Sequence, residues 1–146
     1  MEEKDIIVQE LESIRKANNG ILSPHAVIEA AADEKSPLHS RFTWDDTEAA
    51  EQYRLWQARQ LIRLIVTIVP TEKKEYIVRQ YISLSQDRVA DGGYRLVTDV
   101  MSDLELRKQM LIDAVKELRI FRIKYARLNE LAGVFAEMDK LEKTVV

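Results

Sequence analysis

Histidine and carboxylate side chains are the first candidates for chemistry in this sequence, and they are few. His25 and Glu29 stand four residues apart, about one helical turn, which suits two ligands of one metal ion. A zinc site needs at least three protein ligands, and the neighbouring sequence offers no third. We therefore expect no metal site, and we interpret His25 as a surface residue and His39 as a turn residue that bonds locally.

Carboxylates without a nucleophilic or basic partner give little support for catalysis. Asp45-Asp46 is explained by helix capping. Asp87-Arg88 precedes Gly92-Gly93-Tyr94-Arg95 in a segment that a binding site could use, although a loop salt bridge accounts for it too. The chain has no Gly-x-Ser-x-Gly sequence, phosphate loop or dinucleotide fingerprint. We expect a non-enzymatic protein without cofactors; a deep polar cleft around these residues and Tyr81 would reopen the enzyme alternative.

Basic residues form two groups that could contact the phosphates of DNA. The first is on a predicted helix and consists of Arg54, Arg59 and Arg63. The second lies within the basic stretch 107–127, where the candidates are Lys116, Arg119 and Arg127. Each group also fits a purely structural role. The first could compensate the helix macrodipole, and the second could form a solvated face with long side-chain stems.

Composition limits the class of protein. The chain has 146 residues, of which 46% are apolar and 32% charged, with four glycines, three prolines and no cysteine. Disulfides, thiolate zinc sites and iron–sulfur clusters are excluded. The net charge of −3 argues against unspecific coating of nucleic acid. The charged start of the chain resembles no signal peptide, and the longest apolar run is too short for a membrane span, so we expect a cytoplasmic protein that binds no membrane.

The first part of the chain predicts three helices. Helical spacing of apolar residues covers about 3–18, where Asn18-Asn19-Gly20 is typical of a helix end. A second helix begins at Ser23-Pro24 and ends near residue 33. After a connector over 34–44, anchored by Phe42 and Trp44, Asp45 and Glu48 form a capping box for a third helix that ends near residue 64. Its inward residues should be Tyr53, Trp56, Leu61, Ile62 and Ile65.

From residue 65 onward, the spacing of apolar residues changes from that of a helix to that of β-strands. Residues 65–69 are β-branched, and residues 76–84 alternate, which predicts a β-hairpin or small sheet. Residues 94–97 could supply a third strand.

The last third predicts one long helix over about 103–142, opened by a capping box of Ser102 and Glu105. At 1.5 Å per residue it would be roughly 60 Å long. One side carries a heptad stripe typical of a coiled-coil seam: Leu111, Ala114, Leu118, Phe121, Tyr125, Leu128, Ala132 and Phe135.

The opposite side of that helix is also apolar. It carries Ile112, Ile120, Ile123 and Val134, whereas a helix side that faces water should be polar. We therefore expect partners on two sides, one of them a second copy in a homodimer or higher homo-oligomer. The alternative is a helix that breaks near Gly133 and folds back as a hairpin within one chain.

Three helices at the start permit a helix-turn-helix interpretation, with arginines of the third helix as DNA contacts. The connector of about eleven residues is longer than the usual three or four, and the acidic first turn would face phosphates badly.

The middle of the chain resembles a family of small proteins encoded by bacteriophages and prophages, a family without an assigned activity. The resemblance rests on these residues: Leu22-Ser23-Pro24, Ser36-Pro37-Leu38-His39, Phe42-Thr43-Trp44-Asp45-Asp46, Ala49-Ala50, Tyr53-Arg54, Gln57-Ala58-Arg59, Leu61-Ile62-Arg63, Tyr81-Ile82-Ser83-Leu84, Asp87-Arg88 and Gly93-Tyr94-Arg95. It covers about half the chain and implies a phage origin in a bacterial host, with no reaction.

Together these observations predict a mainly helical α+β protein. A helical unit with a small sheet would occupy residues 1–97, and the long helix residues 98–146. We expect a non-enzymatic, DNA-associated phage protein that dimerises through the long helix. The alternative is an assembly module that binds a host or phage protein and ignores nucleic acid.

Overall fold

The first helix, α1 (Glu3–Ala17), ends where the sequence predicts, because Asn19 and Gly20 both adopt positive φ angles. The computed structural model describes residues 2–44, 47–90 and 92–145. The chain divides into two compact units, Met1–Asp99 and Val100–Val146, which we call unit 1 and unit 2.

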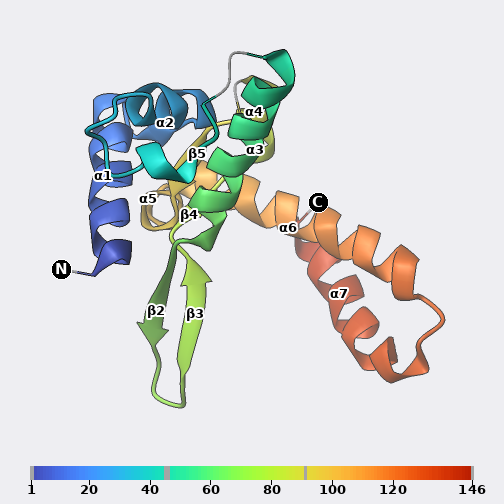
Figure 1. The fold of residues 1–146 in the computed structure, drawn as a ribbon. Helices are drawn as coiled ribbons and strands as arrows, with labels where there is room; N and C mark the ends of the chain where they lie inside the picture. Colours follow the sequence, from blue (N-terminus) through green and yellow to red (C-terminus); the bar gives the residue numbers. More distant parts are fainter. Residues whose placement is uncertain (1, 45–46, 91, 146) are drawn as a thin grey trace. The chain divides into compact units, whose positions relative to one another are not determined.

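Two more helices follow in unit 1 (Figure 1). A two-residue strand, β1 (Ile21–Leu22), leads into α2 (Pro24–Ala31), whose N-terminus is capped by Ser23 as predicted. The connector contains a short 3-10 turn, η1 (His39–Arg41). The third helix, α3 (Glu48–Leu64), ends at the predicted residue.

The start of α3 differs from the prediction. Its cap is Thr47, whose side chain accepts a 3.2 Å hydrogen bond from the Ala50 amide. The predicted capping box of Asp45 and Glu48 is therefore wrong, because Glu48 is the first residue of the helix and a capping box needs its glutamate at the third. Asp45 and Asp46 themselves lie outside the described residues.

The core of unit 1 lies among the three helices and β1. It contains these buried side chains: Ile7, Leu11, Ile14, Leu22, Val27, Ala31, Leu38, Phe42, Ala58, Leu61, Ile62, Ile65, Tyr81 and Tyr94. Phe42 thus anchors the connector as expected, whereas Trp44 remains 38% exposed.

The predicted hairpin is present. Strands β2 (Val66–Pro70) and β3 (Glu75–Arg79) pair antiparallel with Val66 opposite Arg79. The predicted second strand over residues 76–84 is too long, because the chain breaks pairing at Gln80. There the Gln80 amide donates to the Ile65 carbonyl at 3.0 Å, and the Gln80 carbonyl accepts from the Val97 amide at 2.9 Å.

Beyond Gln80 the chain enters a second sheet. Strand β4 (Tyr81–Ile82) is followed by α4 (Ser85–Ala90) and β5 (Tyr94–Leu96), and the strand order is β1-β5-β4 with antiparallel neighbours. The predicted third strand therefore exists, but it pairs with β1 and β4 instead of joining the hairpin.

The last third is a helical hairpin. After α5 (Val97–Ser102), α6 (Leu104–Tyr125) ends well before the predicted residue 142, and η2 (Asn129–Leu131) leads into α7 (Ala132–Val145). Leu128 leaves the helical conformation with φ −81° and ψ 103°. The single long helix is therefore wrong, and the alternative of a hairpin within one chain is correct, with the break before Gly133.

The N-terminal cap of α6 is also one residue from its predicted position. Asp103 accepts hydrogen bonds at 3.0 Å from the amides of Glu105 and Leu106, so the capping box of Ser102 and Glu105 is wrong. The protein is nevertheless an α+β protein that is mainly helical, as the sequence predicts.

Candidate nucleic-acid interface

Helix α3 buries one side and exposes the other. The buried stripe consists of Leu55, Ala58, Leu61 and Ile62, which recur at helical spacing. Tyr53 and Trp56 lie on the opposite side and are 49% and 51% exposed. The prediction that these two aromatic side chains point inward is therefore wrong. The buried stripe begins at Leu55, between the two aromatic residues in the sequence, so the stripe and the aromatic pair face opposite sides of the helix.

The exposed side of α3, which we call the α3 face, has a composition suited to DNA. Its aromatic rings are stacked, with the Tyr53 and Trp56 centroids 5.7 Å apart. Polar side chains that can pair with base edges or phosphates flank them. The members of the α3 face are Gln52, Tyr53, Trp56, Arg59, Gln60 and Arg63, of which Arg59 and Gln60 are half-buried and the others exposed.

The acids of the first turn, Glu48 and Glu51, are exposed. Glu48 precedes Gln52 of the α3 face by four residues, so a carboxylate lies at the edge of this face near the start of the helix. The objection that the acids of the first turn would face phosphates therefore holds for the N-terminal end of α3, and DNA contacts would have to come from its second half.

Arg54 occupies a different place from the other two arginines. Its Nη1 donates to the Thr43 carbonyl at 2.9 Å, and its guanidinium lies 5.4 Å from the centroid of the Trp44 ring. Arg54 thus fixes the connector to α3. Of the three arginines predicted as contacts, Arg59 and Arg63 share the α3 face and Arg54 does not.

The connector is held by further contacts around Trp44. The indole Nε1 of Trp44 donates to the His39 carbonyl at 2.8 Å, and the two rings are stacked at 4.9 Å. His39 Nδ1 lies 2.8 Å from the Ala31 carbonyl at the end of α2. His39 therefore bonds locally, as predicted, and helps to join α2 to the segment that precedes α3.

A network of charged side chains connects α1 to the three-stranded sheet. The Tyr81 hydroxyl donates to Glu12 at 2.7 Å, and Arg15 donates to both Glu12 oxygens at 2.9 and 3.1 Å. Burial raises the pKa of Glu12, but the hydrogen bonds from Arg15 and Tyr81, with the charges of Arg15 and Lys16, outweigh burial and hold this pKa below its ordinary value. Burial and the bond to Glu12 raise the pKa of Tyr81.

The residues of the enzyme alternative are engaged in contacts within the fold. Buried Asp87 accepts from Arg95 Nε at 2.9 Å and from Arg95 Nη2 at 2.8 Å, and it also accepts from the Leu84 amide at 3.1 Å. Asp87 therefore joins α4 to β5, and Tyr81 is engaged with Glu12. These contacts account for both residues as parts of the fold of unit 1.

In unit 2, ion pairs connect the two arms of the helical hairpin. Arg119 donates to Glu142 at 3.0 Å, Arg122 donates to Asp139, and the Arg122 guanidinium lies 5.4 Å from the centroid of the Phe135 ring. Arg119, predicted as a DNA contact, is thus paired across the hairpin. The other two candidates of the basic stretch, Lys116 and Arg127, are exposed.

The two apolar sides of α6 have different surroundings. Leu118 and Tyr125 of the heptad stripe are half-buried and Phe135 is buried, while Leu111, Phe121 and Leu128 keep between 41% and 47% exposure. This stripe therefore packs in part against α7 of the same chain.

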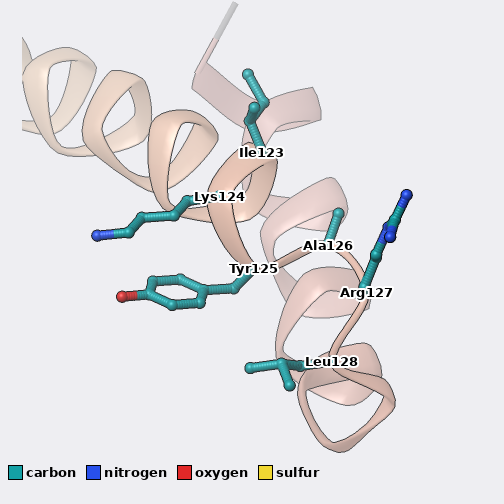
Figure 2. Close-up of a pocket in the computed structure, with 6 residues that line it drawn as sticks. All are labelled: Ile123, Lys124, Tyr125, Ala126, Arg127 and Leu128. Carbon is teal, nitrogen blue, oxygen red and sulfur yellow. The ribbon is translucent and has the colours of Figure 1, made fainter.

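The second apolar side, which we call the isoleucine row, consists of Ile112, Ile120 and Ile123. Ile112 is half-buried, whereas Ile120 and Ile123 are 68% and 80% exposed. A hollow at the end of α6 is lined by residues 123–128, but Figure 2 shows their side chains diverging, with Lys124 and Tyr125 on one side and Arg127 on the other. Such a hollow lacks the convergent polar groups of a small-molecule site.

The part of the chain that the structure describes has neither a cluster of metal-ligating side chains nor a membrane-spanning helix. Within residues 2–44, 47–90 and 92–145, no three acidic or histidine side chains gather as metal ligands. Of the helices over these same ranges, none combines the length and the apolar character that crossing a bilayer requires.

Comparison with known proteins adds no relative. No protein-family model, curated protein or solved structure matches this chain. The phage family remains a prediction from the sequence motifs.

Sequence reasoning missed the two glutamines and the exposed position of the aromatic pair on the α3 face. A usable signal was present, since residues 55, 58, 61, 62 and 65 alone give a complete helical stripe. Phasing α3 on that stripe would have placed Tyr53, Trp56 and Gln60 outside.

Proposed function

We propose that the protein binds duplex DNA by placing the α3 face in the major groove. The observation that carries the proposal is the composition of this face, where two arginines and two glutamines occur together with a stacked Tyr53–Trp56 pair. A major groove admits one helix, and arginine and glutamine are the side chains that pair bidentately with guanine and adenine.

The surroundings of α3 support this use of the helix. Arg54 and the stacked rings of Trp44 and His39 hold its first half against the connector, so the face is presented on a rigid element. The net charge of −3 means that attraction to phosphate has to be local, through Arg59 and Arg63. The phage resemblance fits this role but names no activity.

Binding to a fluorescently labelled duplex of mixed sequence, measured by anisotropy over a range of salt concentrations, tests the proposal. The wild-type chain should bind at low salt, and the variant R59Q/R63Q should bind at least tenfold more weakly. Its plot of log K against log salt should be shallower by about 0.9 for each of the two arginines that contacts a phosphate.

The matched control is K4Q/K16Q, which removes the same charge from exposed positions of α1. It should retain wild-type affinity within about twofold. Equal losses of affinity in both variants would mean that binding depends on overall charge and not on the α3 face. No binding by the wild-type chain at low salt would contradict the proposal.

A second proposal concerns self-association of unit 2. The observation is that α7 covers one apolar side of α6 in part, while Ile120 and Ile123 of the isoleucine row are exposed. Burying each isoleucine would contribute roughly 1.5–3 kcal/mol. We propose that two copies associate through this row.

Light scattering coupled to size-exclusion chromatography measures the mass directly. The wild-type chain should give twice its mass of 16.9 kDa, and I120S/I123S should give the single mass. V89S is a control, because Val89 is an apolar residue of unit 1 that is 89% exposed, more than either isoleucine. A wild-type monomer at micromolar concentration refutes this proposal, and a dimer that ignores DNA would favour a protein-assembly role.

A further inference from the structure

Four exposed residues of unit 2 lie in line along α6 and the turn that follows it. They are spaced by four, three and four positions, which places them on one stripe of a helix. Ala126, the C-cap of α6, keeps helical angles of φ −55° and ψ −26°, so the stripe continues beyond Tyr125. These residues, which we call the α6 stripe, are Lys116, Ile120, Ile123 and Arg127.

The α6 stripe is symmetric about its centre. The midpoint between Ile120 and Ile123 is also the midpoint between the two cations, Lys116 and Arg127. A dimer with a two-fold axis needs a surface that is complementary to itself, because each contact occurs twice. With the axis at this midpoint, two antiparallel stripes would set Ile120 of each copy against Ile123 of the other. The exposed isoleucines would then cover one another.

The residues beside the stripe also fit an antiparallel pair. Glu117 and Lys124 are exposed and seven positions apart, so they flank the stripe on the same side. In antiparallel helices this side of one copy faces the same side of the other. Glu117 of each copy could therefore pair with Lys124 of the other, as charges beside a helix seam commonly do.

The ends of the stripe differ, because they would bring like charges together. Lys116 of one copy would meet Arg127 of the other at both ends of the contact. Within the part of the chain that the structure describes, neither side chain has an ion pair, whereas Arg119 and Arg122 are paired with carboxylates of α7. Asp113, three positions before Lys116, is buried and accepts from Gln109 at 2.9 Å, so it does not reach this surface. Each end of the contact therefore needs an anion.

We propose that the dimer of unit 2 binds a phosphate group at each end of its isoleucine contact, between Lys116 of one copy and Arg127 of the other. This inference rests on the proposed self-association through the isoleucine row. A guanidinium offers a planar fork of N–H donors to phosphate, and an ammonium adds a point charge. The site is incomplete in one chain, where the two cations are separated by about 16 Å of helix. Because only the dimer holds the complete site, phosphate should favour the dimer.

Cysteine cross-linking tests the antiparallel contact, since the chain has no cysteine of its own. A mixture of K116C and R127C chains, oxidised mildly, should give the mixed dimer in at least tenfold excess over the two homodimers, which mass spectrometry distinguishes. Without this excess, Lys116 of one copy does not meet Arg127 of the other, and the inference is overturned.

Sedimentation equilibrium tests the site through the Kd of the dimer, measured at pH 7 in sodium chloride and in sodium phosphate of equal ionic strength. Phosphate should lower the Kd of the wild-type chain at least fivefold. In chloride, K116Q/R127Q should dimerise about fivefold more tightly than wild type, because four repelling cations have left the contact. Phosphate should change the Kd of this variant by less than twofold, and any such change measures the general effect of the salt on apolar burial.

The matched control is K4Q/K16Q, which removes the same charge from exposed positions of α1 and should behave as wild type in both salts. If K116Q/R127Q matches wild type in both salts, the phosphate site is overturned and the dimer stands. A wild-type chain that stays monomeric in both salts overturns the self-association as well.

A short duplex identifies the source of the phosphate. The measurement uses R59Q/R63Q in chloride, so that the α3 face contributes little. A lower dimer Kd with micromolar duplex would support the site with the DNA backbone as the ligand. A lower Kd with inorganic phosphate alone would support it with free phosphate as the ligand, and no change with either overturns the site.

Discussion

The hydroxyl of Tyr81 on β4 donates a 2.7 Å hydrogen bond to the carboxylate of Glu12 on α1. The bond joins residues that are 69 positions apart in the sequence. Arg15 shares the same carboxylate, and it also donates to Asp99 at 3.3 Å. The network links α1, the sheet and α5, so that charge and core packing support each other.

The network predicts acid sensitivity of unit 1. The pKa of Glu12 is lower in the folded protein than in the unfolded chain, so its contribution to stability is present above the ordinary glutamate value of about 4.3 and is lost as the pH falls through the folded value. Tyr81→Phe should lower the free energy of unfolding at pH 7 by about 2 kcal/mol, since the lost bond involves a charged group. Urea titrations between pH 3 and 7 should show a weaker pH dependence for Y81F; an unchanged profile would contradict this role.

A second prediction concerns the ion pair of buried Asp87 and half-buried Arg95. Asp87→Asn should cost about 3 kcal/mol, because it removes the negative charge that Arg95 contacts. The control is Asp99→Asn, whose side chain is 60% exposed and whose ion pair with Arg15 should contribute less than about 1 kcal/mol. Chemical denaturation monitored by circular dichroism gives both values. Similar losses of unfolding free energy in the two variants would mean that Asp87 stabilises the fold no more than an exposed ion pair does.

A third prediction concerns the helical hairpin of unit 2. Phe135→Ala removes a buried ring that lies against Arg122, and should cost about 3–5 kcal/mol. The neighbouring Val134→Ala changes an exposed side chain and should cost little. Hydrogen exchange should then be fast over residues 132–145 in F135A only. Slow exchange there in F135A would contradict the packing of α7 on α6.

The sequence predicts α1, α2, the end of α3 and the hairpin because each has a local cause. Ser23 caps α2 through its own side chain, and Asn19 with Gly20 ends α1 through backbone conformations open to few residues. These signals lie within a few residues of their effects, so the local sequence pattern reveals them.

The missed features have distant or competing causes. The break after Tyr125 follows no proline or glycine, and the pairing of Arg119 with Glu142 and the burial of Phe135 accompany the return of α7. Likewise, the chain leaves the hairpin at Gln80 because Ile65 and Val97 supply backbone partners there. Such contacts join residues far apart in the sequence, and periodicity within one segment does not reveal them.

Part of the candidate site could be predicted from local spacing, and part depends on contacts outside α3. Arg59 and Arg63 share a face by spacing alone, which the sequence shows. The role of Arg54 depends on the connector, since its partners Thr43 and Trp44 lie outside the helix. The place of the stacked Tyr53–Trp56 pair depends on which stripe of α3 enters the core.

The two tryptophans allow the central claim to be tested in one spectrum. Trp56 lies on the α3 face, whereas the Trp44 indole is bound to the His39 carbonyl away from that face. Indole N–H resonances of a ¹⁵N-labelled chain, assigned with Trp56→Phe, should be followed as duplex DNA is added. The account predicts that the Trp56 resonance shifts or broadens first while that of Trp44 stays near its free position; a complex in which Trp56 is unaffected would contradict it.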